Sequence, residues 1–483
     1  MPPLLYSGCS RAAGMTAALQ MRTERDTLGE VSVPDDALYG AQTQRAVENY
    51  PISGLRAHPA LIVAFIQIKK AAALANKELS ALDGAIADAI VAACDLVLTD
   101  FERYRPQFVV DVFQAGAGTS FNMNCNEVIA NLANVSLGGT LGEYKLVHPN
   151  DHVNASQSTN DVFPTAMRVA AVSQTDRLMP LLQGLANAFD EKGQQFADVI
   201  KSGRTHLQDA VPVTLGQEFR AYAAALTRAN RLLVEAGTEL FDLGIGGTAV
   251  GTGINAPHGF REVVIRHINA AYDVNFLRSQ GDLREAMQSQ LPIGAISSAL
   301  RNLALELTRV TNDLRLLASG PHTGLAEIIL PAVQPGSSIM PGKVNPSMLE
   351  CMNQICFHII GAATAVDYAL QAGQLELNVM MPLMAYEVLF SIEILKNFLP
   401  VFTEKCIRGI EADRARCQAY YISSPALATA LNPIIGYARA AEIARESAKS
   451  GTPIPQLLRE KKLLSDEEIA RIFTPGFLAG QAD

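Results

Sequence analysis

The feature that most restricts the fold is a set of long stretches in which apolar residues recur at helical spacing. Helices of about 25 residues or more are typical of helical bundles, whereas ordinary globular helices are shorter. Strand signals are sparse along the chain. The sequence therefore predicts an all-α protein with a central long-helix bundle, and the expected long runs are 180–200, 215–242, 282–319, 349–372 and 380–410.

Shorter helical patterns precede the bundle, and a proline marks a boundary within it. The N-terminal part contains amphipathic patterns at 59–79, 84–98 and 126–136. Pro180 follows a helical run, and proline has no backbone N–H to continue the hydrogen-bond ladder. We therefore expect Pro180 either to separate two helices or to begin the second one.

Chain length and a change of pattern predict the domain organisation. The 483 residues exceed the size at which a single core usually stops growing. After residue 412 the helical stretches become short and are punctuated by proline and glycine, and the first twenty residues lack the apolar core of an export signal. The predicted parts are a disordered extension (1–20), an N-terminal helical domain (21–155), a central bundle domain (156–412) and a small C-terminal helical domain (413–483).

The composition indicates an oligomer and argues against nucleic acid and membranes as partners. Hydrophobic residues make up 49% of the chain and charged residues only 18%, so sister subunits are expected to cover much apolar surface. The run 349–372 is long enough to cross a membrane, but Asn353, His358 and Asp367 interrupt it, and polar groups are costly in hydrocarbon. A net charge of −9 disfavours nucleic acid and anionic membranes as partners. Seven cysteines without CxxC spacing are typical of reduced thiols, so we expect a cytoplasmic protein.

The loop 336–346, GSSIMPGKVNP, contains the residues best suited to chemistry. It is too rich in glycine and proline to continue a helix, although apolar helical runs flank it, so it can open and close between rigid elements. Two hydroxyls (Ser337 and Ser338), a cation (Lys343) and an amide (Asn345) suit an anionic substrate whose charge increases during the reaction. The same composition is also found in solvated surface turns.

Four further segments place small residues, hydroxyls and amides where an apolar core would not require them. Each precedes a helical run, so its backbone N–H groups and the helix N-terminus can hold an anion. Taken singly, each also fits an ordinary helix-capping loop. Together they favour an anion-binding site, and they begin at Gly116, His148, Gly203 and Gly244.

Two motif matches do not indicate a dinucleotide cofactor or a metal site, and the motif of a hydrolase triad is missing. The segment 251–256 fits the GxGxxA dinucleotide pattern but has no strand before it and no surrounding βαβ unit. His148 and His152 have the spacing of a metal pair, but Pro149 argues against the helix that such a pair requires. No Gly-x-Ser-x-Gly segment occurs in the chain.

The loop sequence GSSIMPGKVNP resembles the signature of the fumarase/aspartase superfamily, whose lyases eliminate ammonia, water or an amine from a succinyl group and release fumarate. The resemblance extends from about residue 22 to residue 476. It includes GAGTSFNMNCNEVIAN at 116–131, HPNDHVNASQSTNDVFPTA at 148–166, GRTHLQDAVPVTLGQEF at 203–219, GGTAVGTGIN at 246–255 and AGQLELNV at 372–379. These segments are similar to the class shared by aspartate ammonia-lyases and class II fumarate hydratases.

The resemblance implies an all-α homotetramer with a central long-helix bundle, in which three different subunits form each active site. The implied ligand is a small dicarboxylate, with no organic cofactor and no metal site. Some relatives are activated by a divalent cation, which no residue pattern in this chain predicts.

Residue roles carry over from the matching motif positions. Ser337 stands where the family has its general base, which removes a proton from the carbon next to a carboxylate, and a serine needs N–H groups and positive charge to act in this way. That carboxylate becomes a doubly charged aci-carboxylate, so hydrogen bonds to it strengthen in the transition state. By the same resemblance, four hydroxyl residues contact this carboxylate: Thr119, Ser158, Thr159 and Ser338. Lys343 and Asn345 contact the α-carboxylate. Asn160, Thr205 and His206 lie near the leaving amino group, and Glu350 pairs with His206.

The motifs also bear on the leaving group. SQSTN at 156–160 and GAGTSFN at 116–122 resemble the ammonia-lyases, whereas GRTHLQDA at 203–210 is the hydratase form. We expect reversible anti-elimination of ammonia from L-aspartate to give fumarate, with fumarate hydration as the alternative. A catalytically silent structural relative would be expected to lose Ser337 or Lys343, and the chain retains both.

Overall fold

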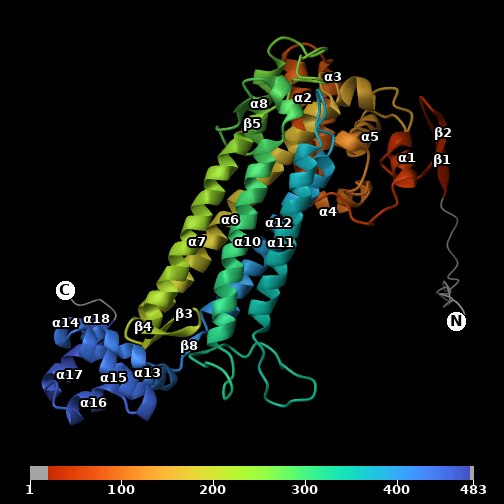
Figure 1. The fold of residues 1–483 in the computed structure, drawn as a ribbon. Coiled ribbons are helices and arrows are strands. Elements are labelled where there is room, and N and C mark those ends of the chain that lie inside the picture. Colours follow the sequence, from red (N-terminus) through yellow and green to blue (C-terminus); the bar gives the residue numbers. More distant parts are fainter. Residues whose placement is uncertain (1–19, 479–483) are drawn as a thin grey trace, which may run out of the picture. The chain divides into compact units, whose positions relative to one another are not determined.

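Helices dominate the chain. The computed structural model describes residues 20–478, so the predicted extension at 1–20 lies outside the described residues except for its last position. The strands of the described part are few and short, which confirms the all-α fold class (Figure 1). The chain forms two compact units, and the predicted domain boundaries at 155/156 and 412/413 stay predictions. Among the described residues, unit 1 comprises 20–170, 241–290 and 369–386, and unit 2 comprises 171–240, 291–368 and 387–478.

Unit 1 consists mainly of helices of moderate length. Its elements are β1 (Met21–Asp26), β2 (Gly29–Pro34), α1 (Ala41–Asn49), α2 (Pro59–Glu78), α3 (Gly84–Thr99), α4 (Phe101–Tyr104), α5 (Thr119–Ser136), the start of α6 (Thr159–Gln195), β5 (Asp242–Leu243), α8 (Phe260–Ala271), β6 (Arg278–Ser279) and α9 (Leu283–Gln288). Strands β1 and β2 form an antiparallel hairpin, and β5 pairs in parallel with β6. Helix α2 packs against both α3 and α8, and α3 packs against α5.

Three buried phenylalanines join the helices of unit 1. The ring of Phe65 in α2 lies 5.0 Å from Phe121 in α5 and 5.5 Å from Phe163 in α6, in edge-to-face contact with both. Aromatic pairs at such distances stabilise a fold beyond the area that they bury. Because Phe121 and Phe163 lie within the first five residues of α5 and α6, the cluster holds the N-terminal ends of these two helices next to α2.

Unit 2 contains the long helices. Its elements before residue 413 are most of α6, β3 (Ile200–Thr205), β4 (Gln208–Thr214), α7 (Leu215–Thr238), α10 (Leu291–Leu317), β7 (Ile328–Ile329), most of α11 (Ser347–Gln371), most of α12 (Met381–Phe402) and β8 (Glu411–Ala412). Helices α6, α7, α10, α11 and α12 run beside one another in Figure 1. A capping box at Thr214 and Gln217 begins α7, which packs along α10. These helices form the predicted bundle.

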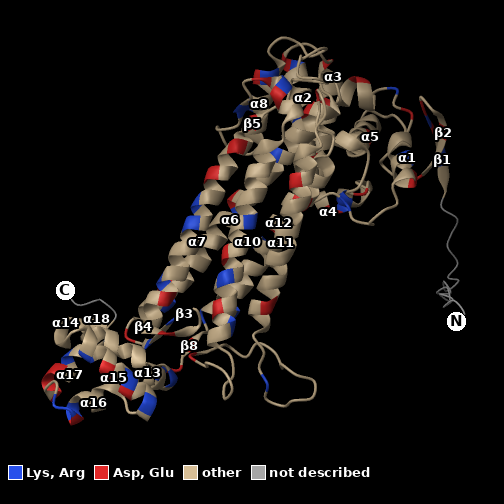
Figure 2. Ribbon diagram, in the orientation of Figure 1, with Lys and Arg blue, Asp and Glu red and all other residues tan. Residues whose placement is uncertain are grey.

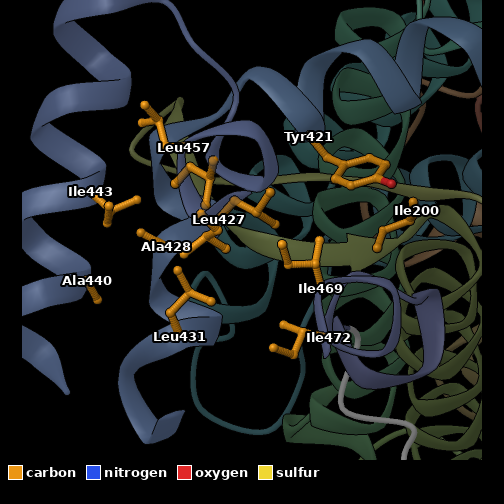
Figure 3. Close-up of a cluster of buried hydrophobic side chains, with 12 residues drawn as sticks. Ile200, Tyr421, Leu427, Ala428, Leu431, Ala440, Ile443, Leu457, Ile469 and Ile472 are labelled. Carbon is orange, nitrogen blue, oxygen red and sulfur yellow. The ribbon is translucent and has the colours of Figure 1, made fainter. Parts of the chain in front are cut away.

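Short helices follow residue 412, as the sequence predicted. They are α13 (Arg414–Ser423), a 3-10 helix at Pro425–Leu431, α14 (Asn432–Ile435), α15 (Tyr437–Ser450), α16 (Ile454–Glu460), α17 (Asp466–Ile472) and α18 (Pro475–Leu478). Their buried apolar side chains form one cluster, and Figure 3 shows Ile200 of β3 beside Tyr421 and Ile469 within it. The C-terminal helices therefore share a core with the first strand of the β3–β4 hairpin.

Helices α11 and α12 carry few charged residues, as the mostly tan ribbons in Figure 2 show. Within residues 20–478, two helices, α2 and α11, are long and apolar enough to cross a membrane by length and composition. The apolar stretch of α2 is 67% buried inside the protein, whereas that of α11 is 44% buried. Phe357 and Tyr368 of α11 are 57% and 67% exposed. Helix α2 is therefore a core helix of unit 1, and α11 presents an apolar face.

Two sequence predictions about helix boundaries are wrong. Helix α6 does not break at Pro180 and continues to Gln195. Leu178, Leu182 and Leu185 are fully buried on either side of the proline, so packing along the whole helix outweighs the lost hydrogen bond. The predicted run 282–319 is not continuous, because a short break at 289–290 separates α9 from α10.

Replacing Pro180 with alanine is expected to stabilise the protein. Pro180 is exposed, so the substitution loses little packing. Restoring the helical hydrogen bond and removing the clash of the proline ring stabilise the folded protein by about 3 kcal/mol together. The alanine also makes the unfolded chain more flexible, which lowers the stability by about 1 kcal/mol. We expect the free energy of unfolding to rise by about 2 kcal/mol, measured by chemical denaturation followed by circular dichroism.

The exposed neighbour Arg177 provides the control, because Arg177→Ala leaves the backbone ladder unchanged and should alter stability by no more than about 0.5 kcal/mol. A Pro180→Ala variant less stable than the parent protein would contradict this account of α6.

Candidate active site

The N-terminal ends of α5 and α6 lie next to each other in unit 1. Gly118 caps α5 with a φ of +80°, and a Cβ atom at this position would lie 2.1 Å from the ring of Phe163 in α6. One turn into α5, Asn122 Nδ2 donates a hydrogen bond of 3.0 Å to Thr159 Oγ1, at the first residue of α6. Thr119 and Thr159 therefore begin two adjacent helices whose free backbone N–H groups favour a negative charge.

The carboxylate of Asp161 joins the start of α6 to the glycine-rich loop at 244–253. Its Oδ1 accepts the backbone N–H of Ser158 at 2.9 Å, and its Oδ2 accepts those of Gly246 at 3.0 Å and Thr248 at 2.9 Å. Asn160 adds a further link, because its Nδ2 donates to the Ala249 carbonyl at 2.8 Å. Burial raises the pKa of Asp161 to about 7, against the lowering effect of these N–H groups. Ser158, Thr159 and Asn160 are thus held in one fixed turn.

A buried polar network lies behind this turn. Lys69 of α2 is fully buried, and its Nζ donates to Asn154 Oδ1 at 2.9 Å. Asn122 and Asn126 also donate to this oxygen, each at 3.2 Å. Burial lowers the pKa of Lys69 to about 7, although Asp161 acts to raise it. Buried groups with strongly shifted pKa values are concentrated at functional sites.

The segment 372–379 supports the turn that precedes α5. The Ala117 N–H donates to the Val379 carbonyl at 2.7 Å, and Ala117 itself has a φ of +59°. Asn378 is fully buried, and its amide donates to the carbonyls of Ala369 and Leu370 at the end of α11. Thr119 is therefore held from two sides, by this segment and by α6.

In unit 2, the β3–β4 hairpin presents His206 at its tip. Thr205 pairs with Gln208, so His206 and Leu207 form a two-residue turn. Their φ values are +54° and +59°, which is the left-handed geometry that such turns favour for asparagine and glycine. A histidine and a leucine there store about 1–3 kcal/mol each of backbone strain, which is characteristic of functional sites. Thr205 and His206 are both exposed.

A buried carboxylate and two cations hold the base of this hairpin. Arg204 forms a bidentate pair with Glu327, with N–O distances of 2.9 and 2.8 Å. Lys201 lies 2.8 Å from the same carboxylate and 2.9 Å from Glu218. The Glu327 side chain is completely buried, so its charge is balanced by these two cations. The network fixes the residues immediately before Thr205 and His206.

The predicted catalytic loop closes on itself in unit 2. The Gly336 N–H donates to the Lys343 carbonyl at 2.9 Å, and Asn345 Nδ2 donates to the Gly336 carbonyl. A Cβ atom on Gly336 would lie 2.3 Å from the Lys343 carbonyl oxygen, so only glycine permits this closure. The loop lines a pocket of about 470 Å³ that includes Ser337 and Lys343.

The hydroxyl oxygen of Ser337 accepts two backbone hydrogen bonds, from Ile339 at 3.2 Å and from Met340 at 2.9 Å. Such bonds favour the deprotonated form of an oxygen over the neutral hydroxyl. Ser338 and Lys343 are exposed beside it, and Glu350 lies half-buried in the first turn of α11. Within unit 2, no described hydrogen bond joins this loop to His206.

The two loop histidines have structural roles. His148 Nδ1 accepts the N–H groups of Asn150 and Asp151, and His152 Nδ1 accepts the N–H of His148. Across residues 20–478, no group of three or more His, Cys, Asp or Glu side chains is placed to hold a metal ion.

Comparison with known proteins decides the family. Residues 29–361 match the lyase family, and residues 427–480 match the C-terminal region of fumarase C. The chain belongs to the lyase family. Membership of the fumarase/aspartase superfamily, predicted from the loop motif, is thereby confirmed.

Relatives along the whole chain narrow the class of this lyase. An aspartate ammonia-lyase from a Bacillus species is 46% identical over 455 residues, which cover 94% of this chain and 97% of the relative. One from Pseudomonas aeruginosa is 47% identical over 468 residues, or 95% and 97% of the two chains. The prediction of an enzyme of the carbon–nitrogen lyase class is confirmed.

Solved structures share the fold. A fumarate lyase:delta crystallin from Brucella melitensis is 47% identical, with a TM-score of 0.92 over 95% of this chain and 100% of that one. A class II fumarase from Schistosoma mansoni is 35% identical, with a TM-score of 0.91 over 96% and 100% of the chains.

Sequence reasoning missed the buried groups that support the site of this lyase. Lys69 stands within an apolar helical run, and its position on the buried face of that helix is the only signal in the sequence. Asp161 follows the predicted binding residues directly, and Asn122 lies one turn after Thr119. Their partners are distant in the chain, so spacing alone did not reveal them.

Replacing Gly118 with alanine is expected to damage this lyase more than the same change at Gly138. Both glycines have positive φ, +80° and +86°, and both lie at ends of α5. The new methyl group at 118 would overlap the Phe163 ring, whereas nothing lies within 4 Å of one at 138. We expect the free energy of unfolding to fall by about 1–2 kcal/mol in both variants, because alanine disfavours the left-handed backbone. In Gly118→Ala it should fall by about 1–3 kcal/mol more, because the methyl group overlaps the Phe163 ring.

Thermal unfolding of the two variants, followed by circular dichroism, measures the difference. Equal losses would show that the Phe163 ring moves aside freely and does not fix the position of Thr119.

Proposed function

We propose that this lyase is an aspartate ammonia-lyase, which eliminates ammonia from L-aspartate to give fumarate in a reversible anti-elimination. The observation on which the proposal depends is the Ser337 hydroxyl, whose oxygen accepts two backbone N–H groups in a loop that also carries Lys343. The names of the similar ammonia-lyases and the SQSTN segment support aspartate as the substrate.

Ser337 is the proposed general base. It removes the proton from the carbon next to the β-carboxylate, and its two N–H donors stabilise the oxygen while it lacks its own proton. Loop closure over the substrate adds positive charge and excludes water, which strengthens the base further.

The β-carboxylate receives the negative charge released by proton removal. Thr119 and Thr159, at the starts of α5 and α6, and the neighbouring Ser158 supply hydroxyl groups where helix N-termini already favour an anion. Ser338 is proposed to supply a further hydroxyl. Because these donors are held before the reaction begins, they stabilise the aci-carboxylate without reorganisation.

The other end of the substrate is bound by different groups. Lys343 and Asn345 are proposed to hold the α-carboxylate, and one N–H of the Asn345 amide remains after its bond to the Gly336 carbonyl. Asn160, Thr205 and His206 are proposed to surround the leaving amino group, with Glu350 as the partner of His206.

We further propose a homotetramer with active sites formed by three subunits. The apolar face of α11, with Phe357 and Tyr368 exposed, and the low charge of α11 and α12 support burial between subunits (Figure 2). Free thiols at all six described cysteines support a cytoplasmic enzyme.

The substrate proposal has a direct test. Purified protein is incubated with L-aspartate and, separately, with L-malate, and fumarate is followed by its ultraviolet absorbance. We expect fumarate from L-aspartate alone. Fumarate from L-malate alone would instead identify a fumarate hydratase, which the likeness to the class II fumarase makes the second candidate.

Ser337→Ala is expected to lower kcat by about 10³-fold or more, because the base itself is removed. The variant should keep its fold and assembly, checked by circular dichroism and gel filtration. Ser338→Ala serves as the matched control and should retain a measurable rate, since it removes only one of several donors. Near-normal turnover by a well-folded Ser337→Ala variant would remove this residue from the role of base.

A further inference from the structure

The hydrogen bonds behind the Ser158–Asn160 turn have a defined direction. Asn154 sets it from two sides, because its Nδ2 donates to the Gln157 carbonyl at 3.2 Å and its Oδ1 accepts from Lys69 Nζ at 2.9 Å. The carbonyl can only accept, and the lysine nitrogen carries hydrogens to donate whether it is charged or neutral. The Asn154 amide therefore has one orientation that satisfies both neighbours.

The orientation of Asn154 determines that of Asn122. The atom of Asn122 that faces Asn154 Oδ1 at 3.2 Å must be a donor, so it is Nδ2. The same Nδ2 lies 3.0 Å from Thr159 Oγ1, and its two hydrogens serve these two acceptors. Asn122 Oδ1 is buried and has no hydrogen-bond partner among residues 20–478, so the two acceptors that face the nitrogen determine this orientation.

The Thr159 hydroxyl is consequently left with a free proton. Its oxygen already accepts a hydrogen bond from Asn122, so its own O–H must point elsewhere. Among the described residues, no acceptor receives a hydrogen bond from Thr159 Oγ1. Thr159 is 8% exposed at the first residue of α6, so a bound anion can reach this proton.

We propose that Asn122 is a positioning residue that orients the Thr159 hydroxyl as a hydrogen-bond donor to the substrate carboxylate. The inference rests on the proposed function, in which Thr159 contacts the carboxylate that gains charge during proton removal. A hydroxyl that donated to its neighbour would present lone pairs to this anion. Asn122 prevents that arrangement without touching the substrate.

A double-mutant cycle tests the inference. Asn122→Leu removes the amide with little change in volume, and Thr159→Val removes the hydroxyl with little change in shape. We expect Asn122→Leu to lower kcat/KM by about 10-fold or more, mainly through kcat, because a correctly aimed donor matters most in the transition state. In the Thr159→Val background, Asn122→Leu should change kcat/KM by less than about 2-fold. In the Thr159→Ser background, which keeps a hydroxyl, the loss should persist.

Asn122→Asp provides a second test, because a carboxylate accepts the Thr159 proton and reverses the direction of the bond. We expect this variant to lose at least as much kcat/KM as Asn122→Leu. Asn124→Leu is the matched control on the same helix, since Asn124 is equally buried but bonds to Gln107 and Val109. Its effect should be the same with or without the Thr159 hydroxyl.

Equal losses from Asn122→Leu in the parent and Thr159→Val backgrounds would overturn the inference, as would full activity of Asn122→Leu. If the leucine variant fails to assemble, Asn122→Ala completes the same cycle. A parent enzyme that acts on L-malate would refute the proposed substrate while still allowing the cycle to be measured. If neither substrate is turned over, the Kd of fumarate is measured for the same variants by calorimetric titration, and the double-mutant cycle is calculated from Kd in place of kcat/KM.

Discussion

One carboxylate connects the two segments on which the site of unit 1 is built. Asp161 accepts the N–H groups of Ser158, Gly246 and Thr248, which brings together loops that are 85 and more residues apart in the chain. A buried carboxylate is stable only when hydrogen bonds or charges compensate its desolvation, so the two loops must both be in place. The hydroxyl and amide groups of residues 158–160 therefore have fixed positions before any ligand arrives.

Each unit holds its candidate site residues through a rigid support beside a strained or closely packed turn. In unit 1, Phe65, Phe121 and Phe163 hold the starts of α5 and α6. In unit 2, the Arg204–Glu327 pair secures the hairpin whose tip places His206 in a left-handed conformation. Such conformations persist only where the surrounding structure compensates them, and both supports consist of buried interactions that provide this compensation.

Much of the architecture was predictable because helical spacing is a local property of the sequence. The long helices, the short C-terminal helices and the hydroxyl-rich loops all follow from periodicity and from the placement of glycine and proline. The break expected at Pro180 does not occur, because buried leucines on both sides keep the chain helical through a residue that locally disfavours a helix. Local preference was outweighed there by packing that no short window of sequence contains.

By itself, the sequence determined the fold class, the family and the positions of the hydroxyl, amide and cationic groups in the motif loops. These properties depend on residue identity and on neighbours close in the chain. Only the tertiary structure decided which groups support them, as with Lys69, Asn154 and Asn122 behind Thr159. The direction of a hydrogen bond depends on which donors and acceptors meet in space, and these residues come from α2, α5 and the chain just before α6.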